Sequence, residues 1–311
     1  KVSGTFEEIE NAYGKVSGVW KEADEIYGKV SGVWKLVFSA FEATSFATVS
    51  SGSGTFTVPA QANAIHIQAA VGGGGGGVKG ADYDKAGGES SGAGGGSGSF
   101  ISDKVFSVTA GETISYGVGA GGAPGNQSNQ YNVSGSSGAS TTLSGSSVGA
   151  IFTLGGGSGS SGSGGSVKGP LRSNSPGTGG SATINASAVT SGTFRDSSGA
   201  TVNVSSLNGG PVGTFNQSGN GATGGNNGNC GGDNCRIAGS TGAASYSGNV
   251  AGGSGGSSSG GGTNGSVGTR GSGGGGGSAQ VTAGSSPTNV GRTDGASGGS
   301  GEVQYRFLRI Q

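Results

Sequence analysis

Few residues in this 311-residue chain are of the types that carry out acid–base or nucleophilic chemistry. The one histidine, His66, lies between Ile65 and Ile67 in an alternating pattern that predicts a strand. A histidine on the face of a strand is much more often structural than catalytic. Asp82 and Asp84 are two neighbouring carboxylates, a pairing that general acid–base catalysis uses, but such pairs in a polar loop are usually only solvated.

The remaining motifs are equally weak as signs of a reaction. Serine is abundant, so Gly-x-Ser-x-Gly strings arise freely, and a nucleophile elbow also needs a strand–turn–helix context and a histidine partner. The six glycines at 72–77 open no helix and lack the Lys-Ser/Thr of a phosphate loop. Cys230 and Cys235 enclose Gly-Gly-Asp-Asn, and two ligands do not define a zinc site. A small disulfide and two free thiols both remain open. We expect no enzymatic activity, no cofactor and no metal.

Composition narrows the class of protein further. Glycine accounts for 78 residues and charged residues for only 10%, so a helical bundle or an ordinary α/β enzyme is effectively excluded. Sixteen basic residues balance sixteen acidic ones, which argues against nucleic acid as a partner. No apolar run approaches the 18 residues of a membrane span. Because the chain starts at Lys1 and lacks methionine, we interpret it as the C-terminal part of a longer chain or as a processed product.

A 14-residue repeat separates the first segment from the rest. The string KVSG begins at Lys1, Lys15 and Lys29, and aromatic residues recur at the sixth and thirteenth positions of each repeat. Around Ser31-Gly32 the pattern reads strand, two-residue turn, strand, which predicts a β-hairpin. We therefore assign residues 1–45 to a polar-surfaced attachment module and residues 50–311 to a second, glycine-rich domain.

In that second domain, short apolar segments alternate with Gly/Ser tracts. Each segment is bounded by Gly, Ser or Asn, as strands of all-β folds tend to be. In the last segment, Val303, Tyr305 and Phe307 should share one face. The expected fold class is all-β with little α-helix. The predicted strands are 54–59, 64–71, 100–109, 112–118, 150–154, 182–189, 201–204 and 302–310.

Glycine recurs at every third position within several tracts, for example at 92, 95 and 98 and at 156, 159, 162 and 165. A threefold period fits the left-handed extended helix with three residues per turn, whose glycine edges allow close approach of neighbouring helices. We therefore expect a bundle of polyglycine II helices with short strands at their ends. A flexible Gly/Ser linker is the alternative.

Most remaining charged and aromatic side chains lie in clusters between the tracts. If the tracts run side by side, the connections between them gather at the ends of the bundle. Tyrosine and arginine are favoured in recognition surfaces, although any bundle also needs polar turns. The candidate binding residues are Asp82, Tyr83, Lys85, Tyr131, Leu171, Arg172, Phe215, Arg236, Tyr246 and Arg292.

Several segments together resemble glycine-rich domains of phage tail fibres. They are residues 54–60 (GTFTVPA) and 65–71 (IHIQAAV) before the polyglycine run, then 106–114 (FSVTAGETI), 117–122 (GVGAGG) and the final strand from Gly301. The KVSGVWK repeats are similar to those of phage tail-tip and tail-fibre proteins. The resemblance covers nearly the whole chain; the order of its motifs is moderately specific, whereas polyglycine alone is not.

The resemblance implies a receptor-binding adhesin at the tip of a tail fibre in the virion. It would bind an outer-membrane protein or a surface glycan of a bacterium, and it would associate with other tail-fibre subunits, either as a homotrimer or as a single chain capping a trimer. Two other functions stay open: a glycine-rich ice-binding protein, which needs a flat, regular face of small residues, and a purely structural fibre spacer.

Overall fold

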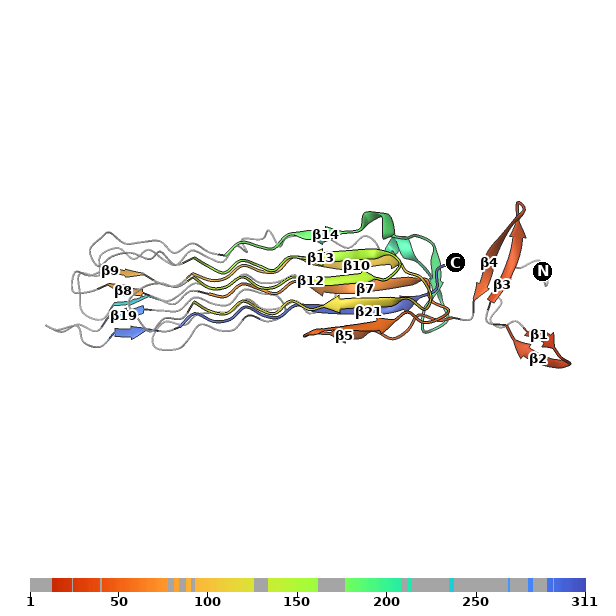
Figure 1. The fold of residues 1–311 in the computed structure, drawn as a ribbon, viewed down its shortest axis with the longest axis horizontal. Coiled ribbons are helices and arrows are strands. Elements are labelled where there is room, and N and C mark those ends of the chain that lie inside the picture. Colours follow the sequence, from red (N-terminus) through yellow and green to blue (C-terminus); the bar gives the residue numbers. More distant parts are fainter. Residues whose placement is uncertain are drawn as a thin grey trace.

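Alternating apolar residues in the predicted strands build two five-stranded sheets, whose pairings are antiparallel, at one end of a slender rod (Figure 1). In the computed structural model, β7 and β21 lie side by side in the first sheet. The model describes residues 13–23, 25–39, 41–77, 81–83, 88–90, 93–125, 134–161, 177–207, 212–213, 235–237, 268, 279–281, 290–292 and 294–311. The first sheet has the order β17 (Val212–Gly213), β10 (Phe100–Ser107), β7 (Ala64–Val71), β21 (Glu302–Leu308), β5 (Ala47–Val49).

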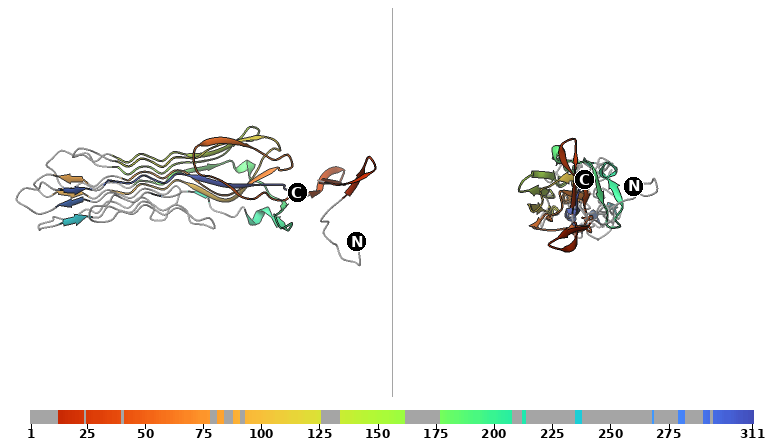
Figure 2. Two further views of the ribbon diagram at one scale, coloured as in Figure 1. Left: turned by 90° about the horizontal axis from the view of Figure 1, so that it is seen from below. Right: turned by 90° about the vertical axis from the view of Figure 1, so that its right-hand side faces the viewer.

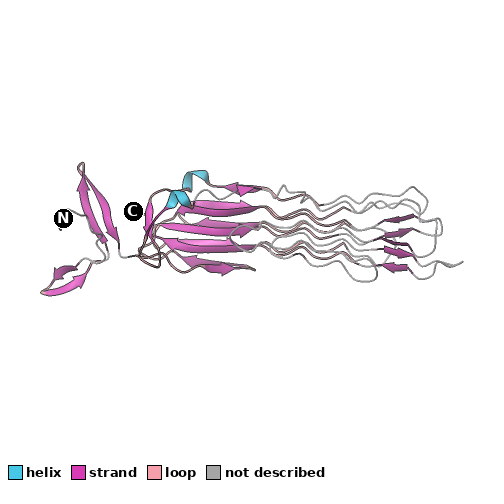
Figure 3. Ribbon diagram, turned by 180° about the vertical axis from the view of Figure 1, so that it is seen from behind, coloured by secondary structure: helices cyan, strands magenta, loops and turns pink. Residues whose placement is uncertain are grey.

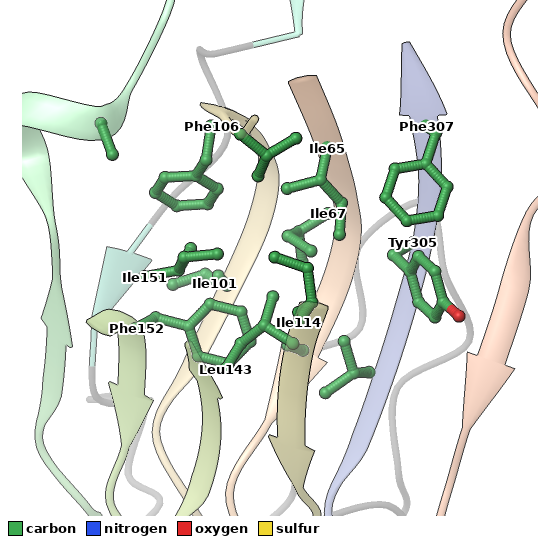
Figure 4. Close-up of a cluster of buried hydrophobic side chains, with 14 of the residues drawn as sticks. Ile65, Ile67, Ile101, Phe106, Ile114, Leu143, Ile151, Phe152, Tyr305 and Phe307 are labelled. Atoms are coloured by element: carbon green, nitrogen blue, oxygen red, sulfur yellow. The ribbon is translucent and has the colours of Figure 1, made fainter. Parts of the chain in front are cut away.

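The second sheet packs face to face with the first. Its order is β14 (Ala182–Ile184), β13 (Gly149–Leu154), β12 (Thr141–Gly145), β11 (Thr113–Gly117), β6 (Ser53–Thr57). The inner faces of the two sheets form one apolar core, in which Ile65 and Ile67 of β7 lie opposite residues such as Ile114, Leu143 and Phe152 (Figure 4). On β21, Val303, Tyr305 and Phe307 all belong to this core, as the alternation in the sequence predicts.

A smaller apolar cluster covers the outer face of the first sheet. It contains Ala64, Val105 and Leu308 from the sheet, and Phe194 and Val204 from the segment that crosses it. That segment contains β15 (Thr193–Arg195), β16 (Thr201–Asn203) and two 3-10 turns, Ala186–Ala188 and Val204–Ser206. The predicted strand 182–189 is therefore shorter than expected, because the chain leaves the sheet after Ile184 and forms the first of these turns. Among the described residues no helix is long and apolar enough to cross a membrane.

The KVSG strings that begin at Lys15 and Lys29 lie in hairpins, as predicted. One hairpin pairs β1 (Tyr13–Val16) with β2 (Val19–Glu22), and another pairs β3 (Glu25–Val30) with β4 (Val33–Ser39). The turn residues Ser31 and Gly32 have φ of 50° and 86°, and the equivalent pair in the other hairpin has 52° and 84°. Two positive φ angles in succession are the signature of the type I′ turn. Both hairpins lie beyond the sheets, at the end of the rod near the C-terminus (Figure 1).

Within the described part of the chain, seven glycine-rich tracts continue the strands and run side by side along the middle of the rod (Figure 3). Three outbound tracts follow β7, β11 and β13, and four return tracts precede β10, β12, β14 and β21. The outbound tracts are residues 72–77, 118–125 and 155–161, and the return tracts are 93–99, 134–140, 177–181 and 294–301.

Hydrogen bonds join each tract to several neighbours with a period of three residues. Along residues 72–77, successive N–H groups donate to three different return tracts in strict rotation, so that the same neighbour recurs at every third residue. Gly72 and Gly75 donate to the carbonyls of Ser99 and Gly96, Gly73 and Gly76 to those of Ala139 and Ser136, and Gly74 and Gly77 to those of Gly299 and Ala296, at 2.8–3.0 Å.

Burial follows the same period. In tract 118–125, Gly119, Gly122 and Gly125 are buried, whereas Ala120 and Ala123 are exposed. A strand would alternate with a period of two. Residues 72–77 and 93–99 are buried at every position and so form the centre of the bundle. Figure 2 shows the rod from below and from the end that carries the sheets and the hairpins.

Candidate functional site

The end of the rod far from the C-terminus carries a second set of short strands (Figures 1 and 3). A hairpin joins β8 (Ala81–Tyr83) to β9 (Gly88–Ser90), and a three-stranded antiparallel sheet has the order β18 (Cys235–Ile237), β19 (Ala279–Val281), β20 (Val290–Arg292). Strand β8 contacts both β19 and β20. We call these five strands the distal tip.

The distal tip contains four of the ten candidate binding residues. Asp82 and Tyr83 lie on β8, Arg236 lies on β18 and Arg292 lies on β20. Segments that are about 150 to 210 residues apart in the chain therefore meet at one end of the rod. These four residues lie in short strands rather than in the loops that we expected. The other candidates, Lys85, Tyr131, Leu171, Arg172, Phe215 and Tyr246, lie outside the described residues.

Strand register adds polar residues that the sequence reasoning did not single out. Asp82 pairs directly with Glu89 in the hairpin, and Arg236 pairs with Gln280 in the three-stranded sheet. Gln280 lies on the central strand of that sheet, outside every cluster named from the sequence. The β-branched and apolar neighbours of Gln280 were the one available sign of a strand there.

The structure describes only one of the two cysteines. Cys235 is the first residue of β18, at the same level of the sheet as Val281 and Val290. Cys230 lies outside the described residues. A disulfide between the two cysteines stays a prediction.

At the opposite end, His66 forms a buried polar cluster on the outer face of the first sheet. Its Nε2 lies 3.4 Å from Oδ1 of Asp103, and Nε of Arg306 donates to its Nδ1 at 3.2 Å. The Arg306 guanidinium also stacks over the rings of Phe46 and Phe194, at 4.6 and 5.3 Å from their centres. Because both ring nitrogens are engaged and the residue is only 2% exposed, His66 links β7, β10 and β21.

The electrostatics of this cluster keep His66 neutral. The pKa of His66 is lowered from 6.5 to about 4, chiefly by burial and also by the nearby Arg306 cation, whereas Asp103 acts to raise it. Burial also lowers the pKa of Arg306. Sequence reasoning identified His66 as structural but missed its partners, since Asp103 and Arg306 are 37 and 240 residues away in the chain.

Within the described part of the chain, no group of three or more His, Cys, Asp or Glu residues is arranged to hold a metal ion.

Comparison with known proteins identifies the larger part of the chain. No curated protein matches the sequence. A family model described as a glycine-rich domain matches residues 48–308, which spans both sheets, the tracts and the distal tip. The chain therefore belongs to this glycine-rich domain family.

Proposed function

We propose that this protein is an adhesin that binds a receptor on the surface of a bacterium through its distal tip. The observation that carries the proposal is the separation of parts along the rod: repeated hairpins at one end, and the four described candidate recognition residues at the other (Figure 1). Such a layout suits a molecule that is attached by one end and makes contact with the other. The sequence resemblance to phage tail fibres supports the same use, with the protein in the virion next to other fibre subunits.

We further infer that the seven tracts are polyglycine II helices. Hydrogen bonds to the same neighbour recur every three residues, which is the repeat of the threefold extended helix. The close packing depends on glycine: a Cβ built at Gly75 would lie 2.0 Å from the carbonyl oxygen of Ser158, and one at Gly121 would lie 1.9 Å from that of Gly298. Bundled helices of this kind form a stiff spacer that holds the distal tip away from the attachment end.

Cell binding tests the adhesin proposal. Fluorescently labelled protein is titrated onto a panel of bacteria, and saturable binding to at least one of them is expected. Reversing charge at the tip with Arg236→Glu and Arg292→Glu should weaken that binding by about tenfold or more. Ser137→Glu, an exposed position on a return tract, also introduces a negative charge but lies outside the strands of the distal tip. It serves as the matched control and should bind as the wild type does.

Two results would contradict the proposal. Absence of saturable binding across a broad panel would favour a structural spacer. Equal binding by the tip variant and the control variant would place any receptor site away from the described strands of the tip.

A second candidate function has one observation in its favour. Ser134, Ser137 and Ser140 are exposed at every third position of one return tract, and in a threefold helix they form a straight row with a spacing of about 9 Å. A regular face of small residues is what an ice-binding protein requires. Thermal hysteresis of the purified protein tests this function, and its absence at millimolar concentration would exclude it.

A further inference from the structure

The two described hairpins of the attachment module expose an unusual amount of apolar surface. Of the eight large apolar residues that are exposed in the described part of the chain, seven lie in these hairpins. Trp20 and Trp34 are each 67% exposed. A two-stranded hairpin is only marginally stable alone in water, and apolar patches of this kind on soluble proteins usually mark an interaction site.

Strand register shows that the two hairpins present the same surface. Trp20 pairs with Lys15, and Trp34 pairs with Lys29 at the equivalent positions of the next repeat. On the opposite face, Val16 pairs with Val19 beside the turn. Each hairpin therefore has one Trp-Lys face and one valine face, and the arrangement repeats every 14 residues.

The domain does not cover these faces, although it holds the second hairpin in place. Arg309, just after β21, pairs with Glu25 at 2.6 Å and donates to the Tyr27 hydroxyl at 3.2 Å. Phe41, which follows the hairpin, packs against the core of the two sheets. These contacts fix the base of the hairpin, while Trp34 near its turn remains exposed.

We propose that these faces bind the same hairpins of a second copy of this chain. A partner that covers both described repeats must present matching surfaces with the same 14-residue period, and this chain itself carries that period. The exposed residues combine apolar groups with lysines, and the repeats also carry acidic residues other than Glu25, which Arg309 already engages. Copies can therefore pair opposite charges around a tryptophan and valine centre, which is the usual composition of an interface.

Intrinsic fluorescence is a direct probe, because Trp20 and Trp34 are the only two tryptophans in the chain. We expect a concentration-dependent blue shift of their emission as the indoles leave water. Over the same concentration range, light scattering should show a mass that is a multiple of 29.1 kDa. Both signals are measured on the full chain.

Substitutions then locate the surface. Trp20→Ser, which keeps Trp34 as reporter, should weaken self-association by about tenfold or more, and the double variant with Trp34→Ser should be monomeric. Ala123→Ser, on an exposed tract position, is the control and should associate normally. The hairpin tryptophans lie outside both apolar cores, so the melting temperature of the domain in each monomeric variant checks that it still folds.

A monomeric wild-type chain with emission independent of concentration would overturn the proposal. Self-association that persists unchanged in the double variant would also overturn it. Since the hairpins and the distal tip lie at opposite ends of the rod, the tryptophan variants leave the proposed receptor site intact, and the two proposals can fail separately.

Discussion

Replacing Gly75 with alanine tests whether the glycine tracts form an ordered bundle. Gly75 lies in the central tract, where a Cβ would be 2.0 Å from the carbonyl oxygen of Ser158, 2.4 Å from its carbonyl carbon and 2.7 Å from the nitrogen of Gly159. All three atoms belong to the backbone, so no side chain can rotate out of the way. Distances under 3.0 Å essentially never occur for a real Cβ, and the neighbouring tract must therefore move by about 1 Å.

Three hydrogen bonds resist that movement. Gly157 donates to Gly73 at 2.8 Å, Ser160 donates to Gly76 at 3.1 Å, and Gly96 donates to Ser158 at 3.0 Å. A shift of about 1 Å lengthens them beyond the range of a hydrogen bond, and each contributes about 1 kcal/mol. Alanine also restricts the unfolded chain, which returns about 0.4–1 kcal/mol. The free energy of unfolding should therefore fall by about 2 kcal/mol.

Thermal unfolding monitored by circular dichroism measures this effect. For a domain of this size, 2 kcal/mol lowers the melting temperature by about 4–8 °C. Gly14→Ala is the control of the same chemical kind, since a Cβ there meets nothing within 4 Å. Ala123→Gly is the control within a tract, because Ala123 is exposed, and it should cost no more than about 1 kcal/mol.

The direction in which Gly75→Ala changes the melting temperature decides whether the tracts form an ordered bundle or a flexible linker. In a flexible linker, Gly75→Ala would be neutral or slightly stabilising, because only the unfolded-state effect would operate. A melting temperature equal to or above that of the wild type would therefore refute the ordered bundle.

Three further perturbations test other parts of the rod. The pKa of folded His66 is about 4 and that of an unfolded histidine is 6.5, so the unfolded state binds more protons between these two pH values. The contribution of His66 to the free energy of unfolding should be full above pH 6.5, fall by up to about 3 kcal/mol on acidification to pH 4, and fall no further below pH 4. Urea denaturation of the wild type and of His66→Gln across this pH range measures the effect. Glu112→Gln should cost about 1–3 kcal/mol in the same assay, since the buried carboxylate accepts from the backbone N–H groups of Thr109 and Ser147 at 2.6 and 2.9 Å; an unchanged urea midpoint would show that neither bond matters. Thr141→Val should lower the free energy of unfolding by about 2 kcal/mol, whereas Thr142→Val, at an exposed neighbouring position on the same strand, should have little effect. Equal urea midpoints for the two valine variants would show that the Thr141 hydroxyl is dispensable.

The sequence pattern predicts strands well where one face is buried. Residues 64–71 form β7 with the bounds expected from composition, and the alternation of Val303, Tyr305 and Phe307 appears unchanged in the core. Strand β12 was not predicted, because TTLSG contains a single large apolar residue, Leu143, and reads as part of a polar tract. Its place in the sheet depends on pairing with β11 and β13, and no local pattern encodes that pairing.

The arrangement of the distal tip is even harder to predict from local sequence patterns. Composition identified Asp82, Tyr83, Arg236 and Arg292 as residues between tracts, and the return of the described tracts to the sheets implies that such connections meet at one end. The contact of β8 with β19 and β20 depends on which tracts are neighbours in the bundle. Glycine tracts are too alike in sequence to specify their neighbours, so the order of tracts follows from the order of strands in the sheets to which they connect.

Because the order of the tracts depends on the sheets, the backbone groups where each strand becomes a tract must find partners in two different patterns. A strand meets the same neighbour every second residue and a tract every third, so backbone groups at the junction cannot all pair with one another. The hydroxyl of Thr141, which is fully buried, accepts from the N–H of Gly119 at 3.0 Å and donates to the carbonyl of Val71 at 2.8 Å. Ser99, also buried, donates to the carbonyl of Ser181 at 2.9 Å in the same role. The hydroxyl residues among the glycines are therefore structural where the repeat changes, and they carry the order of the sheets into the tracts that support the tip.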